Sequence, residues 1–391
     1  MINTEKIQDY MTERGIDGYL LYDFRGSNPA MKQLIGKKFT TRRACWFLPQ
    51  RGEPTIIYHI IDRNAYEWLD CQRIMYTTWQ QYFAALEKVM AGAAVIAMDY
   101  SPDIPIVSAV DGGTIDNVRA MGKRIVSAAD IFTLLTAVWT EENYRSHVYA
   151  SQEIQATKDA AFRLIGDTLH RGGDINEYQV QQFIMNDFAR KGLMAADPAI
   201  VGVGENSSNS HYEPTADKSS PIRKGDLVLI DLWAKKNSGD SVYADITWMG
   251  YCGSEIPEKY IKVFEVAKAA RKAACAFVKE GFARGDKLQG YMVDDVGRKV
   301  IADAGYGEHF VHRIGHSIGP GENVHALGAN MDNFETHDQR EILPATGFSV
   351  EPGIYLGEFG VRTETDMFIT PEGKALVTGG EQEEIIRIMQ E

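Results

Sequence analysis

Four acidic residues in the C-terminal half of the chain lie within apolar runs of strand length. Asp231 interrupts LVLIDLW, Asp245 interrupts VYADITW, Glu351 follows FSV, and Glu364 lies in VRTETDMFI. Burial of an isolated carboxylate costs several kcal/mol, so such a group is usually paired or bound to a metal ion. For any one of the four, an exposed position on a strand is the simpler interpretation. One acidic residue in each of four apolar runs weakens that interpretation.

A short histidine-rich segment offers a further ligand type. Residues 312–325 read HRIGHSIGPGENVH and hold three of the nine histidines, separated by glycines and a proline. Two aspartates, two glutamates and at least one imidazole form a ligand set for hard or borderline divalent metals. Carboxylates can bridge, so five such ligands suit two ions about 3.5–4 Å apart, which bind a water and lower its pKa. The chemistry that this set implies is hydrolysis of an amide.

The carboxylates and histidines need a scaffold that brings them together. Strand-like runs at 226–234, 241–251, 347–356 and 360–370 follow or alternate with helical runs at 140–170, 177–191, 257–279 and 286–304. This order predicts an antiparallel sheet backed by helices, an α+β arrangement. The first third alternates short apolar runs (18–23, 44–49, 55–60 and 94–100) with helical segments (5–15 and 79–91), which predicts a small α/β domain.

Composition excludes several classes of protein. The 391 residues are 44% hydrophobic and 24% charged, with a formal net charge of -13. A chain this acidic lacks the basic footprint of a nucleic-acid-binding protein. It has no apolar stretch of the roughly 20 residues that span a membrane, and its first residues lack the apolar core of a signal peptide. The four cysteines form no C-x-x-C pair, so we expect reduced thiols in a cytoplasmic protein with no membrane partner.

Five segments of residues 201–370 resemble the catalytic domain of the M24-type "pita-bread" metallopeptidases, which include methionine aminopeptidase, aminopeptidase P and prolidase. They occur in the family's order: NSSNSHYEPT (206–215), VLIDLWA to YADITW (228–248), HRIGHSIG (312–319), SVEPGIY (349–355) and GVRTETD (360–366). The first 135 residues are compatible with the N-terminal domain of the creatinase, prolidase and aminopeptidase P branch. The resemblance implies a creatinase/prolidase-type α/β domain at residues 1–138 and a pita-bread catalytic domain at residues 139–391.

The resemblance also implies a role for each metal ligand. Asp231 matches the aspartate that chelates one ion, while Asp245 and Glu364 match the two bridging carboxylates. His316 matches the sole histidine ligand. Glu351 matches the glutamate on the second ion, which also acts as general base and takes the proton of the bridging water to leave a metal-bridging hydroxide. The implied cofactors are two divalent ions, with Mn(II) expected and Zn(II) or Co(II) also suited to the ligand set.

Other residues match the substrate-facing part of the family's site. His325 matches a histidine that hydrogen-bonds the scissile amide and steadies the tetrahedral intermediate. His312 and His211 match histidines that line the substrate pocket, the second near the leaving group. Arg362 and Tyr355 match residues that support the carboxylates. The remaining histidines are expected to be partly exposed loop residues without a catalytic role: His59, His147, His170, His309 and His337.

This chain departs from the family pattern around the site. The segments 232–244 and 317–324 are longer than usual by about three and about two residues, and Leu232 and Trp233 follow the first aspartate, where the family often has glycine. These changes leave every ligand in place and reshape the mouth of the pocket. They are expected to act on substrate preference rather than on the metal chemistry.

The resemblance favours a homodimeric peptidase of Xaa-Pro dipeptides, of the prolidase type. A dipeptidase needs a cation for the carboxylate on the product side, which Arg340 or Arg362 could supply. The alternatives are an aminopeptidase P that accepts longer peptides, a hydrolase of a small non-peptide amide, and a binding module without activity. The intact ligand set argues against the last two.

Overall fold

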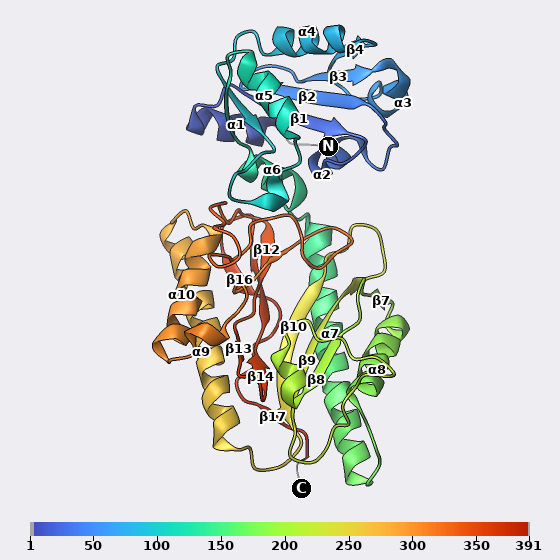
Figure 1. The fold of residues 1–391 in the computed structure, drawn as a ribbon, viewed down its shortest axis with the longest axis vertical. Helices are drawn as coiled ribbons and strands as arrows, with labels where there is room; N and C mark the ends of the chain where they lie inside the picture. Colours follow the sequence, from blue (N-terminus) through green and yellow to red (C-terminus); the bar gives the residue numbers. More distant parts are fainter. Residues whose placement is uncertain (1–3, 390–391) are drawn as a thin grey trace. The chain divides into compact units, whose positions relative to one another are not determined.

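The structure is a computed structural model that describes residues 4–389, and the chain forms two compact units that divide between Thr136 and Ala137 (Figure 1). The sequence places the boundary two residues later, between 138 and 139. Trp139 belongs to the core of the second unit, where its ring stacks on Phe368 with centroids 4.8 Å apart and its Nε1 donates to the Ile318 carbonyl at 3.0 Å.

The first unit is built on one six-stranded mixed sheet in the order β4-β3-β2-β1-β5-β6. Its strands are β1 (Gly18–Phe24), β2 (Arg43–Pro49), β3 (Thr55–His59), β4 (Gln72–Tyr76), β5 (Val95–Met98) and β6 (Arg124–Ser127). Its helices are α1 (Thr4–Arg14), α2 (Pro29–Ile35), α3 (Arg63–Tyr66), α4 (Trp79–Val89), α5 (Gly112–Ala120) and α6 (Ala129–Thr136), with 3₁₀ turns at Ile60–Asp62 and Pro105–Val107. The predicted α/β domain is present, but β4 and β6 escaped prediction because these edge strands are largely exposed and carry no apolar run.

The second unit contains sheets of five, four and two strands, and most of their pairings are antiparallel. Its strands are β7 (Leu193–Met194), β8 (Ile200–Val203), β9 (Leu227–Lys236), β10 (Ala244–Tyr251), β11 (Ser317–Ile318), β12 (Thr346–Val350), β13 (Gly353–Tyr355), β14 (Gly360–Arg362), β15 (Thr365–Ile369), β16 (Ala375–Val377) and β17 (Ile386–Arg387). The five-stranded sheet has the order β17-β10-β9-β7 with β8 on β9, and the four-stranded sheet has the order β11-β12-β15-β16.

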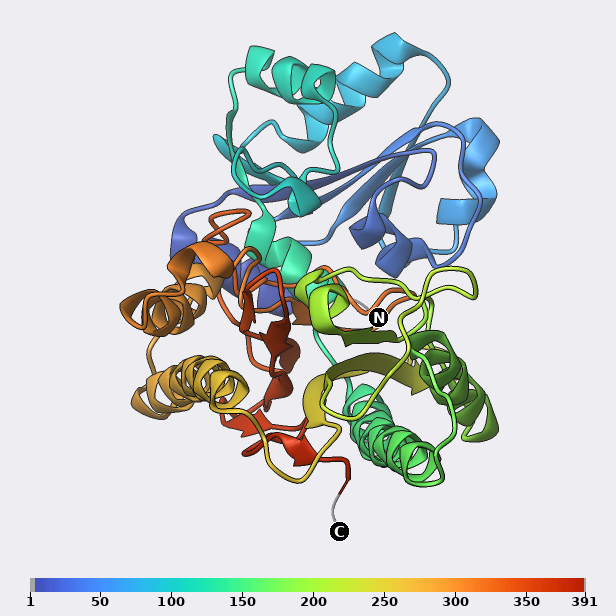
Figure 2. The same ribbon diagram turned by 60° about the horizontal axis from the view of Figure 1, so that its bottom comes forward.

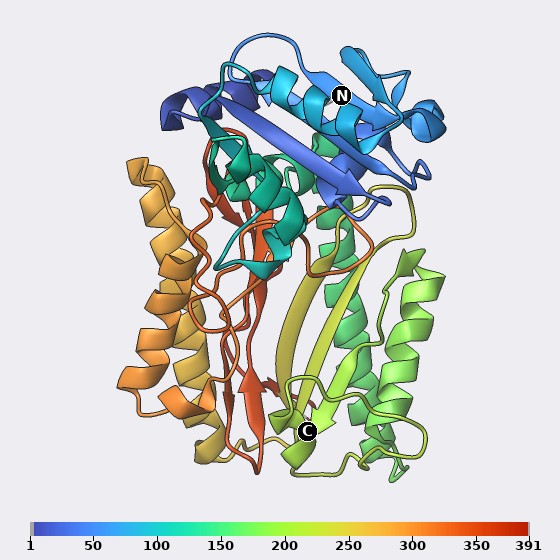
Figure 3. The same ribbon diagram turned by 45° about the horizontal axis from the view of Figure 1, so that its top comes forward.

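Two pairs of helices flank these sheets, as Figure 2 shows nearly end-on. The helices are α7 (Glu141–His170), α8 (Glu177–Arg190), α9 (Glu258–Arg284) and α10 (Gly290–Asp303), with 3₁₀ turns at Gly204–Ser208 and Gly307–His309. Helix α7 packs along β9 and β10, which run side by side against it in Figure 3, whereas α9 packs on β12, β13, β14 and β16. None of the helices within residues 4–389 combines the length and the apolar character needed to cross a lipid bilayer.

Helix α7 begins where the sequence predicts. Thr140 Oγ1 accepts from the Asn143 N–H at 3.1 Å, and Asn143 Oδ1 accepts from the Thr140 N–H at 2.8 Å. This capping box satisfies two backbone donors at the helix start and fixes the first turn of the second unit.

Two of the predicted strands are interrupted, and the prediction that all four acidic residues lie inside strands is wrong for two of them. Glu351 lies between β12 and β13, and Glu364 lies between β14 and β15. Pro352 follows Glu351 and has no N–H for a strand ladder. The Glu364 N–H donates across to the Thr247 carbonyl at 3.2 Å. At both breaks a glutamate therefore lies outside the regular pairing of the strands.

Candidate metal centre

The β9–β10 hairpin presents both aspartates on one face. Asp231 pairs with Thr247 across the hairpin, and Trp233 pairs with Asp245. Side chains two residues apart on a strand share a face, and so do directly opposed residues on neighbouring strands. The four side chains therefore project together, although thirteen residues separate the two aspartates in the chain.

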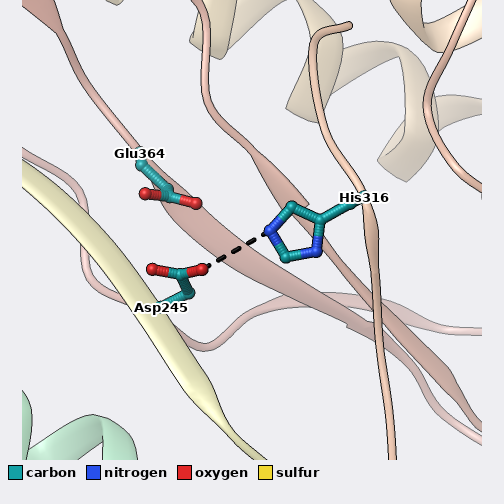
Figure 4. Close-up of side chains that lie close together, drawn as sticks. All are labelled: Asp245, His316 and Glu364. Carbon is teal, nitrogen blue, oxygen red and sulfur yellow. Dashed lines mark ion pairs between the residues drawn. The ribbon is translucent and has the colours of Figure 1, made fainter. Parts of the chain in front are cut away.

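Three candidate ligands converge more closely still. Asp245, His316 and Glu364 each offer one ligand atom, and these atoms all lie within 4.8 Å of one another (Figure 4). Asp245 Oδ2 lies 3.4 Å from His316 Nε2, which also lies 3.5 Å from Glu351 Oε1. The three side chains come from β10, from the residue before β11, and from the break between β14 and β15.

Each of the two carboxylates in this group keeps one oxygen without a partner among residues 4–389. Asp245 Oδ1 and Glu364 Oε1 are buried and have no hydrogen-bond partner within residues 4–389. A buried polar atom without a partner is uncommon, and for a charged group the cost is high. A cation between these oxygens and the imidazole would satisfy them, so the residues fit a divalent metal ion.

Hydrogen bonding leaves the His316 imidazole ready to bind a metal. Its Nδ1 faces the Ser317 carbonyl at 3.1 Å, and a carbonyl can only accept. Nδ1 therefore carries the proton, and the lone pair of Nε2 points at Asp245. Burial lowers the pKa of His316 well below its usual value, which keeps the ring neutral. Histidine ligands are typically oriented by such a contact through the second ring nitrogen.

Burial dominates the electrostatics of the acidic residues. It raises the pKa of Asp245 and that of Glu364 well above the usual value, and the charges of neighbouring carboxylates raise them further. Burial also raises the pKa of Glu351 to about 7 and raises that of Asp231, although the Arg362 charge opposes both shifts. A bound cation reverses this balance, because its charge favours the ionised carboxylates.

Arg362 and Tyr355 link the candidate ligands to His312. The Arg362 guanidinium pairs with Asp231 and donates from Nη1 to the Tyr355 hydroxyl at 2.9 Å. His312 Nδ1 faces the Arg313 carbonyl at 2.7 Å, so its Nε2 accepts from the Tyr355 hydroxyl at 2.8 Å. Burial lowers the pKa of His312 to about 3, so this histidine stays neutral and serves as an acceptor.

His325 stacks close to the candidate ligands and faces the cavity. Its ring centroid lies 4.0 Å from that of His316, and its Nδ1 lies 3.4 Å from Arg313 Nη2. Because arginine can only donate, Nδ1 is the acceptor and Nε2 carries the proton. Burial lowers the pKa of His325 to about 4. His211 is exposed on its loop, and its backbone N–H donates to Asn209 Oδ1 at 3.2 Å.

Nine of the side chains that the sequence pattern assigns to the site line one cavity of about 630 Å³ in the second unit: His211, Asp231, Asp245, His312, His316, His325, Glu351, Arg362 and Glu364. Tyr355 does not line the cavity and lies behind it, in contact with Arg362 and His312. Apolar and aromatic residues line it as well, including Ile200, Tyr212, Trp233 and Val324. The cavity therefore combines a cluster of acidic and imidazole groups with an apolar wall.

Sequence reasoning missed one side chain that joins these groups. Thr247 Oγ1 donates to Glu364 Oε2 at 2.8 Å and accepts from Arg362 Nε at 3.0 Å. It lies two residues after Asp245 on the same strand face, so the period of two could have found it.

His147 departs from its predicted environment. The sequence analysis expects a partly exposed loop residue, but the ring is buried in α7, with Nδ1 2.6 Å from the Tyr243 carbonyl and Nε2 2.7 Å from Thr378 Oγ1. It is a structural link between α7 and the strands.

Comparison with known proteins gives the class of this chain. The sequence profile of metallopeptidase family M24 matches residues 150–371, and the chain belongs to that family. The predicted family is thereby confirmed, and the family implies divalent metal ions. The chain is 32% identical to the Xaa-Pro dipeptidase of Lactobacillus delbrueckii subsp. lactis over 217 residues, which are 55% of this chain and 54% of that protein. It thus spans about half the length of this and other curated relatives that it matches.

Longer alignments extend the likeness to the first unit. The probable dipeptidase PepE of Mycobacterium tuberculosis is 24% identical over 366 residues, with 90% of this chain and 88% of that protein covered. The solved structure of dipeptidase PepE from Mycobacterium ulcerans has a TM-score of 0.70 at 22% identity, covering 99% of this chain and 97% of its own. The prolidase from Pyrococcus horikoshii OT3 has a TM-score of 0.60 at 21% identity, covering 98% and 99%. These likenesses confirm the predicted fold: an N-terminal α/β domain and a pita-bread catalytic domain.

Proposed function

We propose that this chain is a metal-dependent peptidase that cleaves the bond before proline, with Xaa-Pro dipeptides as its main substrates. The observation that carries the hydrolytic part is the convergence of Asp245, His316 and Glu364 around two buried carboxylate oxygens that lack partners. The relatives named Xaa-Pro dipeptidase support the choice of substrate.

In this proposal five side chains hold two divalent ions, with Mn(II) as the native metal. Asp231 and Glu351 would each hold one ion, Asp245 and Glu364 would contact both, and His316 would offer Nε2. When bound, the ions supply Lewis acidity towards the scissile carbonyl and a nucleophile at neutral pH.

The proton transfers fall to residues of this chain. Glu351 lines the cavity and accepts a hydrogen bond from Ser349 Oγ at 3.2 Å on Oε1. Its Oε2 has no donor within residues 4–389, so it takes the proton of the attacking water and passes it to the leaving nitrogen. His325 donates from Nε2 to the oxygen that gains charge as the amide becomes tetrahedral.

Arg362 and Tyr355 hold their neighbours rather than the substrate. Arg362 forms an ion pair with Asp231 and donates to the Tyr355 hydroxyl. That hydroxyl donates to His312 and thereby orients the His312 ring at the cavity wall. His211 lies at the exposed rim, where it can meet the leaving group.

The test combines elemental analysis with a substrate panel. The purified protein is analysed for bound metals and then assayed on Xaa-Pro dipeptides before chelation, after chelation, and after Mn(II) is added back. We expect hydrolysis that chelation abolishes and Mn(II) restores. Hydrolysis of Xaa-Xaa dipeptides without proline at equal rates would remove the proline preference, and chelator-resistant hydrolysis would remove the metal mechanism.

A homodimeric, cytoplasmic protein with reduced cysteines is part of the same proposal. Analytical ultracentrifugation of the purified chain tests the assembly state. A single species with the 43.7 kDa mass of one chain would contradict the dimer.

A further inference from the structure

The cavity holds little positive charge to meet an anionic substrate group. Among the residues that line it, the only lysine or arginine side chains are Arg313 and Arg362. Arg362 is 3% exposed and already contacts Asp231, Tyr355 and Thr247. Each of its three guanidinium nitrogens already has a partner in the protein.

Arg340, the other cation that the sequence analysis considers, is not available either. It is buried, and its Nη2 and Nε lie 2.6 and 2.9 Å from the Asp338 carboxylate. Its Nη1 donates to the Leu327 carbonyl at 2.7 Å. Arg340 does not line the cavity, so it stabilises the loop around it instead.

Arg313 differs from both, because its donors are only partly used. Its side chain is 20% exposed, with Nη1 3.2 Å from Glu335 Oε2 and Nη2 3.4 Å from His325 Nδ1. The backbone N–H of Arg313 also donates to Glu335 Oε1 at 3.1 Å, which fixes the Glu335 carboxylate beside the guanidinium. Nε has no acceptor within residues 4–389. A guanidinium has five donors, so Arg313 can still bind a carboxylate.

The position of Arg313 matches the length of a dipeptide. In the residue after the scissile bond, the carboxylate carbon is only two bonds from the amide nitrogen, of about 1.46 and 1.52 Å. A cation that reads this carboxylate must therefore lie beside the group that meets the amide. Arg313 contacts His325, whose ring lies 4.0 Å from that of His316.

We propose that Arg313 binds the C-terminal carboxylate of the substrate and thereby makes the site selective for free dipeptides over longer peptides. This inference rests on the proposed function, because it assigns the product side of the same cleft. Glu335, which also lines the cavity, holds the guanidinium in place. In a longer peptide the terminal carboxylate is replaced by a neutral amide, which leaves Arg313 without its charged partner.

The test compares two substrates that differ only in this group. Ala-Pro and Ala-Pro-amide are assayed with the Mn(II)-loaded protein and with its Arg313→Gln variant. We expect the wild type to prefer the acid by roughly tenfold or more in kcat/KM, mostly through KM, because a charge-assisted hydrogen bond is lost with the amide. In Arg313→Gln the acid-to-amide ratio falls towards one.

The ratio isolates the carboxylate contact from other effects of the substitution. Arg313 also contacts His325, so Arg313→Gln lowers turnover of both substrates, and that loss cancels in the ratio. Arg145→Gln is the matched control, because it removes the same charge from a residue that does not line the cavity. Arg145 is exposed on α7 and pairs there with Glu141. We expect this control to keep the wild-type ratio.

Three results distinguish failure of the inference from failure of the proposed function. Equal kcat/KM for acid and amide in the wild type, or an unchanged ratio in Arg313→Gln, overturns the role of Arg313 while leaving the peptidase intact. If neither substrate is hydrolysed, calorimetric titration with L-proline and L-prolinamide decides the matter. Proline binding that prolinamide does not match and that Arg313→Gln abolishes supports the contact, and equal binding of the two overturns it.

Discussion

Each unit of this protein buries acidic side chains, and Asp99 of the first unit differs from Asp245 and Glu364 of the second in the partners of its oxygens. In the first unit Asp99 is fully buried and both its oxygens have donors: the Tyr19 hydroxyl at 2.8 Å and Asn28 Nδ2 at 2.7 Å. In the second unit Asp245 and Glu364 are buried to a similar degree, yet each keeps one oxygen without a partner. Burial alone therefore does not distinguish a structural carboxylate from a candidate ligand.

The pKa directions agree with this contrast. Burial raises the pKa of Asp99 to about 7, and its two hydrogen bonds limit the rise. The pKa of Asp245 and that of Glu364 rise well above the usual value, because neighbouring carboxylates add to the effect of burial. Protein donors satisfy the carboxylate of Asp99. The carboxylates around Asp245 and Glu364 instead concentrate negative charge, which a bound cation would compensate.

The strongest test of this comparison removes a predicted bridging ligand. Asp245→Ala or Glu364→Ala should lower kcat/KM by about 1000-fold or more, since a metal's contribution to the transition state is worth several kcal/mol. Inductively coupled plasma mass spectrometry of the purified variants should show at least one bound metal ion fewer per chain than in the wild type. Asp99→Asn is the matched control in the first unit and should keep both metals. Full activity in either alanine variant would take that residue off the ligand set.

The next effect concerns the group that faces the substrate. His325→Ala should lower kcat by about 100- to 1000-fold, or ~2.7–4 kcal/mol, as for the loss of one oxyanion donor. Metal content should stay at the wild-type level, because His325 Nδ1 faces Arg313 and its Nε2 carries a proton. Loss of metal together with activity would reassign His325 as a ligand.

A smaller effect tests the support behind the ligands. Thr247→Val keeps the side-chain shape but removes the hydroxyl between Glu364 and Arg362. We expect metal affinity to fall about 10- to 100-fold, as is usual when a ligand's hydrogen-bond partner is lost. Competition with a chelator measures it. Thr157→Val is the matched control, since Thr157 Oγ1 bonds Asp187 outside the cavity, and equal affinity in the two variants would contradict the role of Thr247.

The smallest effect is a pH dependence of stability in the first unit. The pKa of Asp99 is raised to about 7 in the folded chain from 3.8, so the folded state binds the extra proton between these values. Its contribution is present in full below pH ~4 and is lost as the pH rises through about 7, by at most about 1.4 kcal/mol per pH unit.

Thermal unfolding of the wild type and Asp99→Asn at pH 5 and pH 7.5 measures this dependence. Asparagine does not titrate, but its amide group meets the Asn28 donor. The variant should therefore be less stable than the wild type at pH 5 and approach it at pH 7.5. A constant difference between the two would show that Asp99 does not titrate in this range.

Much of the architecture was predictable because it is written in local patterns. The alternation of residues around Asp231 and Asp245 fixes a hairpin with both side chains on one face, and the Thr140 cap fixes the start of α7. The order of five short motifs identified the family and, with it, nine residues that the structure places around one cavity. The breaks that carry Glu351 and Glu364 were missed, because apolar character continues across them.

The sequence by itself determined that Asp231 and Asp245 lie on one strand face, since side-chain direction on a strand repeats every two residues. Only the tertiary structure decided which buried donor meets which acceptor. Thr247 reaches Glu364 across 117 positions, and Arg340 is withdrawn from the cavity by Asp338 while Arg313 remains in it. Such pairings depend on how distant segments pack together, and no local period in the chain encodes them.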